Sequence, residues 1–366
     1  MSRLNQFLSG IRVLDLTRHI PGPLATLLMA DMGAEILKIE PPGGDEMRTL
    51  GPKNTEGCSI YFDALNAGKS ARRMDLKNPA QRAAFLDLVK SHDVLIESFR
   101  PGVMARLGLG YDVLQQTNPG LVYCAMNGYG AEGPLAEAAG HDNNYLALAG
   151  ILHRNGEGNP VVPDPPMSDS AGALMAIIAI LGALNARGRD GKGCAIDLAL
   201  ADAAMPLQTY QLAALGRAGI VPQPGDYYLN GGAAYYQTYA TADGRHVALG
   251  AVERKFWEAF CRAADHPEWI LRQDEPMPQT ALKAEVAAFF AERTLDHTLA
   301  QFASADCCLT PILDLRAAAE SPRVRQRGLL PRGSAGDYQA LFPALVDGEP
   351  PQPRAPLVDL DEAAKS

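Results

Sequence analysis

The chain has 366 residues, of which 47% are hydrophobic and 20% are charged, as is usual for a soluble globular enzyme. It carries 33 Lys and Arg against 42 Asp and Glu, for a net charge of −9. This acidic balance argues against a nucleic-acid or anionic-membrane partner, because both bind basic surfaces. The length predicts two domains or one large α/β unit.

The first 200 residues alternate between short apolar runs and stretches with helical spacing. The expected strands are residues 11–16, 34–39, 93–97, 121–126 and 194–198, and the expected helices are 23–32, 79–90 and 171–186. This order predicts a parallel sheet with helices on both faces. Ligands of such sheets bind at the carboxyl ends of the strands, so residues 17–21, 98–106 and 127–130 are expected along one edge.

The pattern changes after about residue 200. Two alternating stretches, 234–239 and 246–249, flank an Asp243-Gly244 turn, which is typical of a β-hairpin. Helices are expected from Arg254 and from Thr280, followed by a short strand at 311–313. The segment from Pro343 is rich in proline and charge and is expected to cover the surface.

The cysteines, the N-terminus and the longest apolar run indicate the cellular location of the protein. The six cysteines contain no C-x-x-C pair, so reduced thiols are expected rather than a zinc or disulfide framework. The N-terminus lacks the pattern of a signal peptide, which favours a cytoplasmic protein. The apolar run at 171–186 is shorter than the roughly 18–20 residues of a membrane span, so a buried helix is predicted.

Several common motifs are absent from the sequence. It contains no G-x-G-x-x-G after the first strand, no G-x-x-x-x-G-K-[ST], no G-x-S-x-G and no H-E-x-x-H. Dinucleotide, P-loop, serine-hydrolase and zinc-hydrolase sites are therefore not expected.

Three polar residues each precede or begin a predicted helix. His141 opens a helix whose positive end stabilises an anion and favours a neutral imidazole, as in a base beside oxyanion donors. Asp169 stands before the apolar helix, where burial raises the pKa of a carboxyl group and a helix terminus lowers it. Glu253 stands just before another helix. A structural capping role is the alternative for each residue.

A series of motifs in this order resembles family III of the CoA-transferases, from about residue 10 to about residue 328. The motifs are Leu14-Asp15-Leu16-Thr17-Arg18, Pro21-Gly22-Pro23, Asp31-Met32-Gly33-Ala34-Glu35, Lys38-Ile39-Glu40-Pro41, Asp75-Leu76-Lys77, Asp93-Val94-Leu95-Ile96-Glu97, Phe99-Arg100-Pro101-Gly102-Val103, Arg106-Leu107-Gly108 and Gly128-Tyr129-Gly130. Two others resemble the α-methylacyl-CoA racemase branch, namely Gly140-His141-Asp142 with Asn144-Tyr145, and Gly250-Ala251-Val252-Glu253.

The resemblance implies an α/β fold in which the chain forms a ring and interlocks with a second copy as a homodimer. Residues 1–200 would form a large Rossmann-like CoA-binding domain and 225–320 a smaller α+β domain, with 321–366 returning to the large domain. It also implies that residues of the large domain bind CoA, namely Arg18, His19, Ile20, Met74, Lys77, Arg100 and Arg106.

The racemase branch also implies roles for five residues. His141 and Asp169 would be the two proton-transfer groups, and Glu253 of the partner chain would orient the histidine. Amide groups of the helix starting near Asp142 would hold the enolate oxygen, and Tyr145 would line the pocket. No metal or redox cofactor is implied, since coenzyme A is part of the thioester substrate. The implied reaction is racemisation of 2-methyl-branched acyl-CoA, within lipid metabolism.

Two alternatives remain open. The racemase branch carries a glycine run after the aspartate, whereas this chain has Ser170-Ala171-Gly172-Ala173. An Asp-Ser pair is closer to the CoA-transferases, in which Asp169 would be the nucleophile and form an aspartyl-CoA intermediate. Pro165 and Pro41 also depart from residues of the family pattern. A non-catalytic acyl-CoA-binding protein is the third interpretation.

Overall fold

The computed structural model describes residues 2–156 and 159–363, which form two compact units. Unit 1 contains residues 1–149, 163–207 and 319–366, and unit 2 contains residues 150–162 and 208–318. The chain therefore leaves unit 1 and re-enters it twice. Residues 150–162 belong to unit 2, whereas the family resemblance implied a large domain of residues 1–200.

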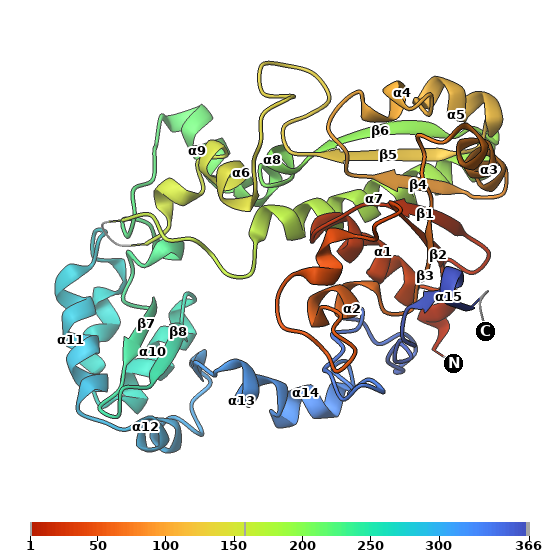
Figure 1. Ribbon diagram of the computed structural model, residues 1–366. Coiled ribbons are helices and arrows are strands. Elements are labelled where there is room, and N and C mark those ends of the chain that lie inside the picture. The colour runs from red at the N-terminus through yellow and green to blue at the C-terminus, as the bar shows by residue number, and fades with distance from the viewer. Residues whose placement is uncertain (1, 157–158, 364–366) are drawn as a thin grey trace. The chain divides into compact units, whose positions relative to one another are not determined.

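Unit 1 is built on a seven-stranded, wholly parallel sheet with the strand order β10-β3-β2-β1-β4-β5-β6 (Figure 1). Its strands are β1 (Arg12–Leu16), β2 (Glu35–Glu40), β3 (Ser70–Arg73), β4 (Val94–Glu97), β5 (Val122–Asn127), β6 (Cys194–Ala199) and β10 (Val358–Asp359). The prediction of a parallel sheet in an α/β fold is confirmed. The edge strand β10 comes from the C-terminal segment, which adds it beside β3.

Helices cover both faces of this sheet because buried side chains alternate along its strands. Val13 and Leu14, adjacent in β1, belong to two different apolar clusters. On the Val13 side lie α1 (Pro21–Asp31) and α7 (Met167–Asp190), and on the Leu14 side lie α3 (Pro79–Lys90), α4 (Val103–Arg106) and α5 (Tyr111–Thr117). The remaining helices of unit 1 are α2 (Ile60–Asn66), α6 (Asp142–Leu148), α8 (Leu200–Ala203), α14 (Pro322–Arg327) and α15 (Leu360–Ala363).

Helix α7 is longer than its apolar run suggested. It has 24 residues, so by length and composition alone it could cross a membrane, contrary to the expectation that it is too short. Core helices of soluble proteins meet the same criterion. In this chain α7 packs against α1 and the strand β5, and Ala173, Ala176 and Ile180 are fully buried in the core of unit 1. We therefore interpret α7 as a core helix.

Unit 2 combines a small antiparallel sheet with helices. The sheet contains β7 (Tyr236–Ala240), β8 (His246–Gly250) and β9 (Leu309–Pro311), in that order. The predicted hairpin is confirmed, whereas the third strand begins two residues earlier than expected. The helices are α9 (Thr209–Ala218), α10 (Arg254–Ala263), α11 (Thr280–Ala291), α12 (Leu295–Gln301) and α13 (Leu315–Ala319), the last of which ends at the border with unit 1. Stacked aromatic rings, including Trp257 and Phe260, fill the core.

Candidate functional site

Two cavities lie at the carboxyl ends of the strands of unit 1, where the parallel sheet predicts ligand binding. The larger, of about 540 Å³, follows the ends of β1, β2, β3 and β4. It is lined by Leu16, Arg18, Ile39, Glu40, Pro41, Pro42, Met74, Asp75, Leu76, Lys77, Phe99, Val103 and Leu107. Its walls are mostly apolar, with basic side chains from two separate loops, which suits a ligand with a flat apolar part and anionic groups.

The smaller cavity, of about 310 Å³, shares Arg18 and Phe99 with the larger one. The guanidinium carbon of Arg18 lies 5.6 Å from the centre of the Phe99 ring. The smaller cavity is lined by Arg18, His19, Pro21, Ser98, Phe99, Arg100, Pro101, Met126, Asn127, Gly128, Ala136, Ala138, Ala139, Gly140, His141, Tyr145, Asp169 and Leu200. The two cavities thus adjoin, and one long ligand could extend from one into the other.

The predicted CoA-binding residues are distributed over these two cavities. Arg18, Met74 and Lys77 line the larger one, and Arg18, His19 and Arg100 line the smaller one. Ile20 and Arg106 are not among the described residues that line either cavity. Ile20 instead stands at the N-cap of α1, and Arg106 is exposed at the end of α4. Their contact with CoA stays a prediction.

A buried ionic network holds the first loop of the site, and the sequence analysis did not assign it a role. The Lys38 ammonium donates to the Thr17 carbonyl at 2.8 Å and pairs with Asp45 at 2.9 Å. The Asp15 carboxylate accepts the Thr17 amide at 2.9 Å and lies 3.3 Å from the Lys69 ammonium. The signal was a charged residue inside each apolar strand, at Asp15 in β1 and Lys38 in β2.

A second buried carboxylate fixes the backbone of Phe99, one of the two residues that both cavities share. Glu97, at the end of β4, accepts the Phe99 amide at 2.6 Å and the Tyr123 hydroxyl at 2.7 Å. Burial raises the pKa of Glu97 to about 7, although both hydrogen bonds oppose the rise. The neighbouring Ser98 hydroxyl accepts the Arg18 amide at 3.0 Å. The loops after β1 and β4 are therefore connected directly beneath the cavities.

His141 stands at the N-cap of α6, as the sequence predicts, and its imidazole is exposed to the smaller cavity. The Asn144 side chain accepts the His141 amide at 3.0 Å, which fixes the backbone at the start of the helix. The ring of His19 lies perpendicular to that of His141, with 6.4 Å between the ring centres. His19 in turn lies 3.3 Å from the Glu46 carboxylate.

Asp169 lines the same cavity, but it is not the N-cap that the sequence suggested. Helix α7 begins at Met167, so Asp169 is its third residue, and the cap is supplied by a different helix. The Oδ1 atom of Asp142 accepts the amides of Ser168 at 2.6 Å and Asp169 at 2.9 Å. Burial, followed by the charge of Asp142, raises the pKa of Asp169 to about 6, and His141 opposes the rise. The pKa of the Asp169 carboxyl group is therefore closer to neutral pH than that of an ordinary aspartate.

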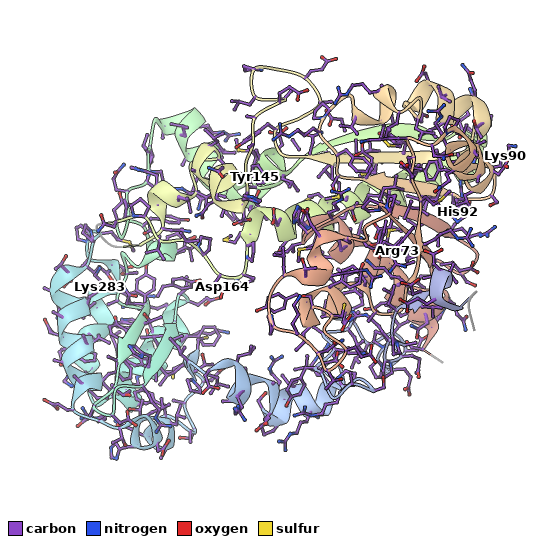
Figure 2. The ribbon with its side chains drawn as sticks, in the orientation of Figure 1. Arg73, Lys90, His92, Tyr145, Asp164 and Lys283 are labelled. Atoms are coloured by element: carbon purple, nitrogen blue, oxygen red, sulfur yellow. The ribbon has the colours of Figure 1, made fainter. Side chains whose placement is uncertain are left out.

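Tyr145 is buried against these groups on α6 (Figure 2). Its hydroxyl donates to the Gly140 carbonyl at 2.6 Å, and its ring contacts that of Tyr129 edge-on at 5.2 Å. Glycine at position 140 leaves room for the Tyr129 hydroxyl, because a Cβ atom there would contact it too closely unless the tyrosine moved. Tyr145 thereby holds the turn that presents His141.

Glu253 belongs to unit 2, where it stands at the N-cap of α10. Its predicted role in orienting His141 from the partner chain stays a prediction. Among residues 2–156 and 159–363, no three His, Cys, Asp or Glu side chains are grouped so that they could hold a metal ion. Within unit 1, His141 and Asp169 are placed where they could transfer protons, and Asp169 is placed where it could act as a nucleophile.

Comparison with known proteins identifies the family. The profile of CoA-transferase family III matches residues 8–361. The chain belongs to CoA-transferase family III. It is 35% identical to the human protein named alpha-methylacyl-CoA racemase over 333 residues, covering 88% of this chain and 81% of that protein. It is 33% identical to acetyl-CoA:oxalate CoA-transferase of Acetobacter aceti over 365 residues, covering 96% and 92%.

Solved structures of the family have the same fold. A CAIB/BAIF family protein from Brucella suis superimposes with a TM-score of 0.85 and 29% sequence identity, covering 98% of each chain. The relatives of this family III chain thus include racemases and transferases at similar identity. The family is therefore established, and both named activities occur among the similar proteins.

We expect Lys77→Ala to weaken the binding of CoA to this family III chain. Lys77 is exposed at the larger cavity, where loss of one charge-assisted contact with a phosphate costs about 1.5–3 kcal/mol, or roughly tenfold or more in Kd. Titration of free CoA by calorimetry at two salt concentrations measures this change. Lys90→Ala, at the other end of α3, is the matched control. Equal affinities of the two variants for CoA would show that Lys77 does not contribute to CoA binding.

Proposed function

We propose that the protein racemises or epimerises 2-methyl-branched acyl-CoA thioesters by transferring the α-proton between two bases. The observation that carries this proposal is that His141 and Asp169 line one small cavity, which adjoins a larger apolar cavity with basic residues. In a racemase one group removes the α-proton from one face of the substrate, and a second group returns a proton to the other face.

The proton transfers balance when His141 and Asp169 act as the two groups. Neutral His141 takes the α-proton as the Cα–H bond breaks, and its electrons form the enolate of the thioester. Protonated Asp169 then donates its proton to the opposite face of Cα. The enzyme is left with a protonated His141 and an ionised Asp169, which is the form required for the other epimer. A pKa of about 6 at Asp169 supports this cycle, because both forms of the carboxyl group are accessible near neutral pH.

In this proposal the N-terminal ends of α6 and α7 face the reacting atoms. The first amides of a helix have no acceptor within it, so those of α6 would donate to the enolate oxygen. The CoA moiety would extend through the larger cavity past Arg18 and Lys77. The reaction proposed here needs only the thioester and proton-transfer groups. We further propose that the protein is cytoplasmic and acts as an interlocked homodimer, in which Glu253 of one chain orients His141 of the other.

A family III CoA-transferase is the second candidate, and two observations favour it. Transferases are among the similar proteins at 33% identity, and Ser170 follows Asp169 where racemases have glycine. In that reaction the Asp169 carboxylate attacks the thioester carbonyl and releases CoA thiolate, which leaves a mixed anhydride. The thiolate then attacks the aspartyl carbonyl and releases the product carboxylate, which yields the aspartyl-CoA thioester.

Exchange of the α-proton with solvent distinguishes these reactions. We expect that incubation of one epimer of a 2-methylacyl-CoA with the enzyme in D2O places deuterium at Cα and yields both epimers. Mass spectrometry and chiral analysis of the acyl group measure these products. Addition of a free carboxylic acid tests for CoA transfer in the same mixture. Transfer to the acid without deuterium at Cα would reject the racemase proposal and support the transferase.

A further inference from the structure

Asp142 connects the two helices that carry the candidate proton-transfer groups. It is the first residue of α6, directly after His141, and its side chain reaches the first turn of α7. There its Oδ1 atom accepts the amides of Ser168 at 2.6 Å and Asp169 at 2.9 Å. One carboxylate therefore fixes the backbone of Asp169 from the helix that begins beside His141.

The Asp142 cap acts on Asp169 through its negative charge as well as through its hydrogen bonds. Asp169 is the third residue of a 24-residue helix, a position where the helix dipole favours an ionised carboxylate. The negative charge of Asp142 opposes that effect, because like charges disfavour ionisation of a neighbouring carboxyl group. A neutral cap such as serine would satisfy the same amides without this opposition.

Other charged groups also face Asp169 or lie on helices that pack against α7. The cationic or titratable groups that line the same cavity are Arg18, His19, Arg100, His141 and Tyr145. On the packed helices, Asp202 of α8 is exposed, and Asp31 of α1 is paired with Arg354 at 2.6 Å. The basic groups favour ionisation of Asp169, so Asp142 is the carboxylate in direct contact with the Asp169 backbone that opposes them.

We propose that Asp142 is a positioning residue whose carboxylate fixes the first turn of α7 and whose charge sets the proton affinity of Asp169. The proposal rests on the proposed role of Asp169, and it applies to either reaction. A racemase requires both protonation states of Asp169 near neutral pH. In a transferase the same charge would limit the fraction of the nucleophilic carboxylate at low pH.

The test compares Asp142→Asn with Asp142→Ala. An asparagine Oδ1 atom can accept the same two amides, so this variant removes the charge and keeps the cap. In this variant we expect the pKa of the Asp169 carboxyl group to fall by about one pH unit. The carboxyl resonance of Asp169, in full-length protein labelled with ¹³C-aspartate and assigned by its loss in Asp169→Asn, reports this pKa without any activity. The alanine variant removes both the charge and the cap, and we expect lower activity at every pH.

Kinetics provide the second measurement. For Asp142→Asn, we expect the acidic limb of the pH profile of kcat/KM to move to lower pH by a similar amount, for the epimer whose α-proton the ionised Asp169 removes or for CoA transfer. Glu137→Gln, which removes an exposed carboxylate of the nearby loop, should leave both measurements unchanged. An unchanged resonance titration in Asp142→Asn overturns the proposal, even if the enzyme is active. Absence of both exchange and transfer in the native enzyme instead rejects the proposed function, and the resonance still tests the role of Asp142.

Discussion

Asp169→Asn is expected to reduce the interconversion of the two epimers by about a hundredfold to ten-thousandfold, the range that general acid–base groups contribute. The amide has the size of the carboxylate but can neither accept nor return the α-proton. It also cannot form the anhydride required for CoA transfer, so transfer should be lost as well. The rate at which one epimer is converted into the other at saturating acyl-CoA, followed by chiral analysis of the acyl group, measures the effect. The Kd for CoA should change less than twofold, because Asp169 lies in the smaller cavity.

His141→Gln is the informative comparison for this result. A racemase with this substitution should lose racemisation by a similar factor, because one face of the substrate no longer has a base. A transferase should keep most of its transfer activity, since the nucleophile on Asp169 is intact. Full racemisation activity in Asp169→Asn would contradict the two-base assignment.

Lys69→Met is expected to lower the free energy of unfolding by about 3–5 kcal/mol, the cost of removing one partner from a buried ion pair. The Lys69 ammonium is 1% exposed and lies 3.3 Å from Asp15, 2.8 Å from the Thr26 hydroxyl and 3.0 Å from the Asn66 side chain. Methionine fills the space but leaves the Asp15 charge less compensated. Urea unfolding at pH 7 measures the loss.

Two further measurements separate charge from packing in this network. Lys90→Met, at an exposed pair with Asp87, should change stability by less than about 0.5 kcal/mol. Adding Asp15→Asn to Lys69→Met should recover part of the loss, because no uncompensated carboxylate remains. Equal stability of Lys69→Met and Lys90→Met would show that the buried pair does not stabilise the fold.

The Asp15 carboxylate also makes the stability of the fold depend on pH. Burial alone would raise the pKa of Asp15, but Lys69, Lys38 and the hydroxyls of Thr17 and Thr26 together lower it to about 2. Because this value is below the ordinary 3.8, Asp15 adds stability above pH 3.8. That contribution is lost as the pH falls from 3.8 toward 2. It should be absent from an Asp15→Asn variant.

The parallel sheet could be predicted because its signals are local. Apolar runs such as 11–16 and 93–97 alternate with helical periods, and burial on both faces of a sheet requires such continuous runs. The helix starts at His141 and Glu253 were also predictable, since capping depends on neighbouring residues. The start and length of α7 were not, because its cap, Asp142, lies more than twenty residues away in the sequence.

The sequence by itself determined the strand–helix order, the family and the three polar residues of the proposed reaction. Only the tertiary structure decided which of them share a cavity, and it placed His141 and Asp169 together within unit 1. It also decided that Asp15 and Lys38 are buried and paired with Lys69 and Asp45, respectively, rather than surface charges. These features depend on desolvation and on contacts between distant segments. The proton affinity of Asp169 therefore arises from packing, and so does the buried ionic network that fixes the first loop. No local sequence pattern encodes this packing.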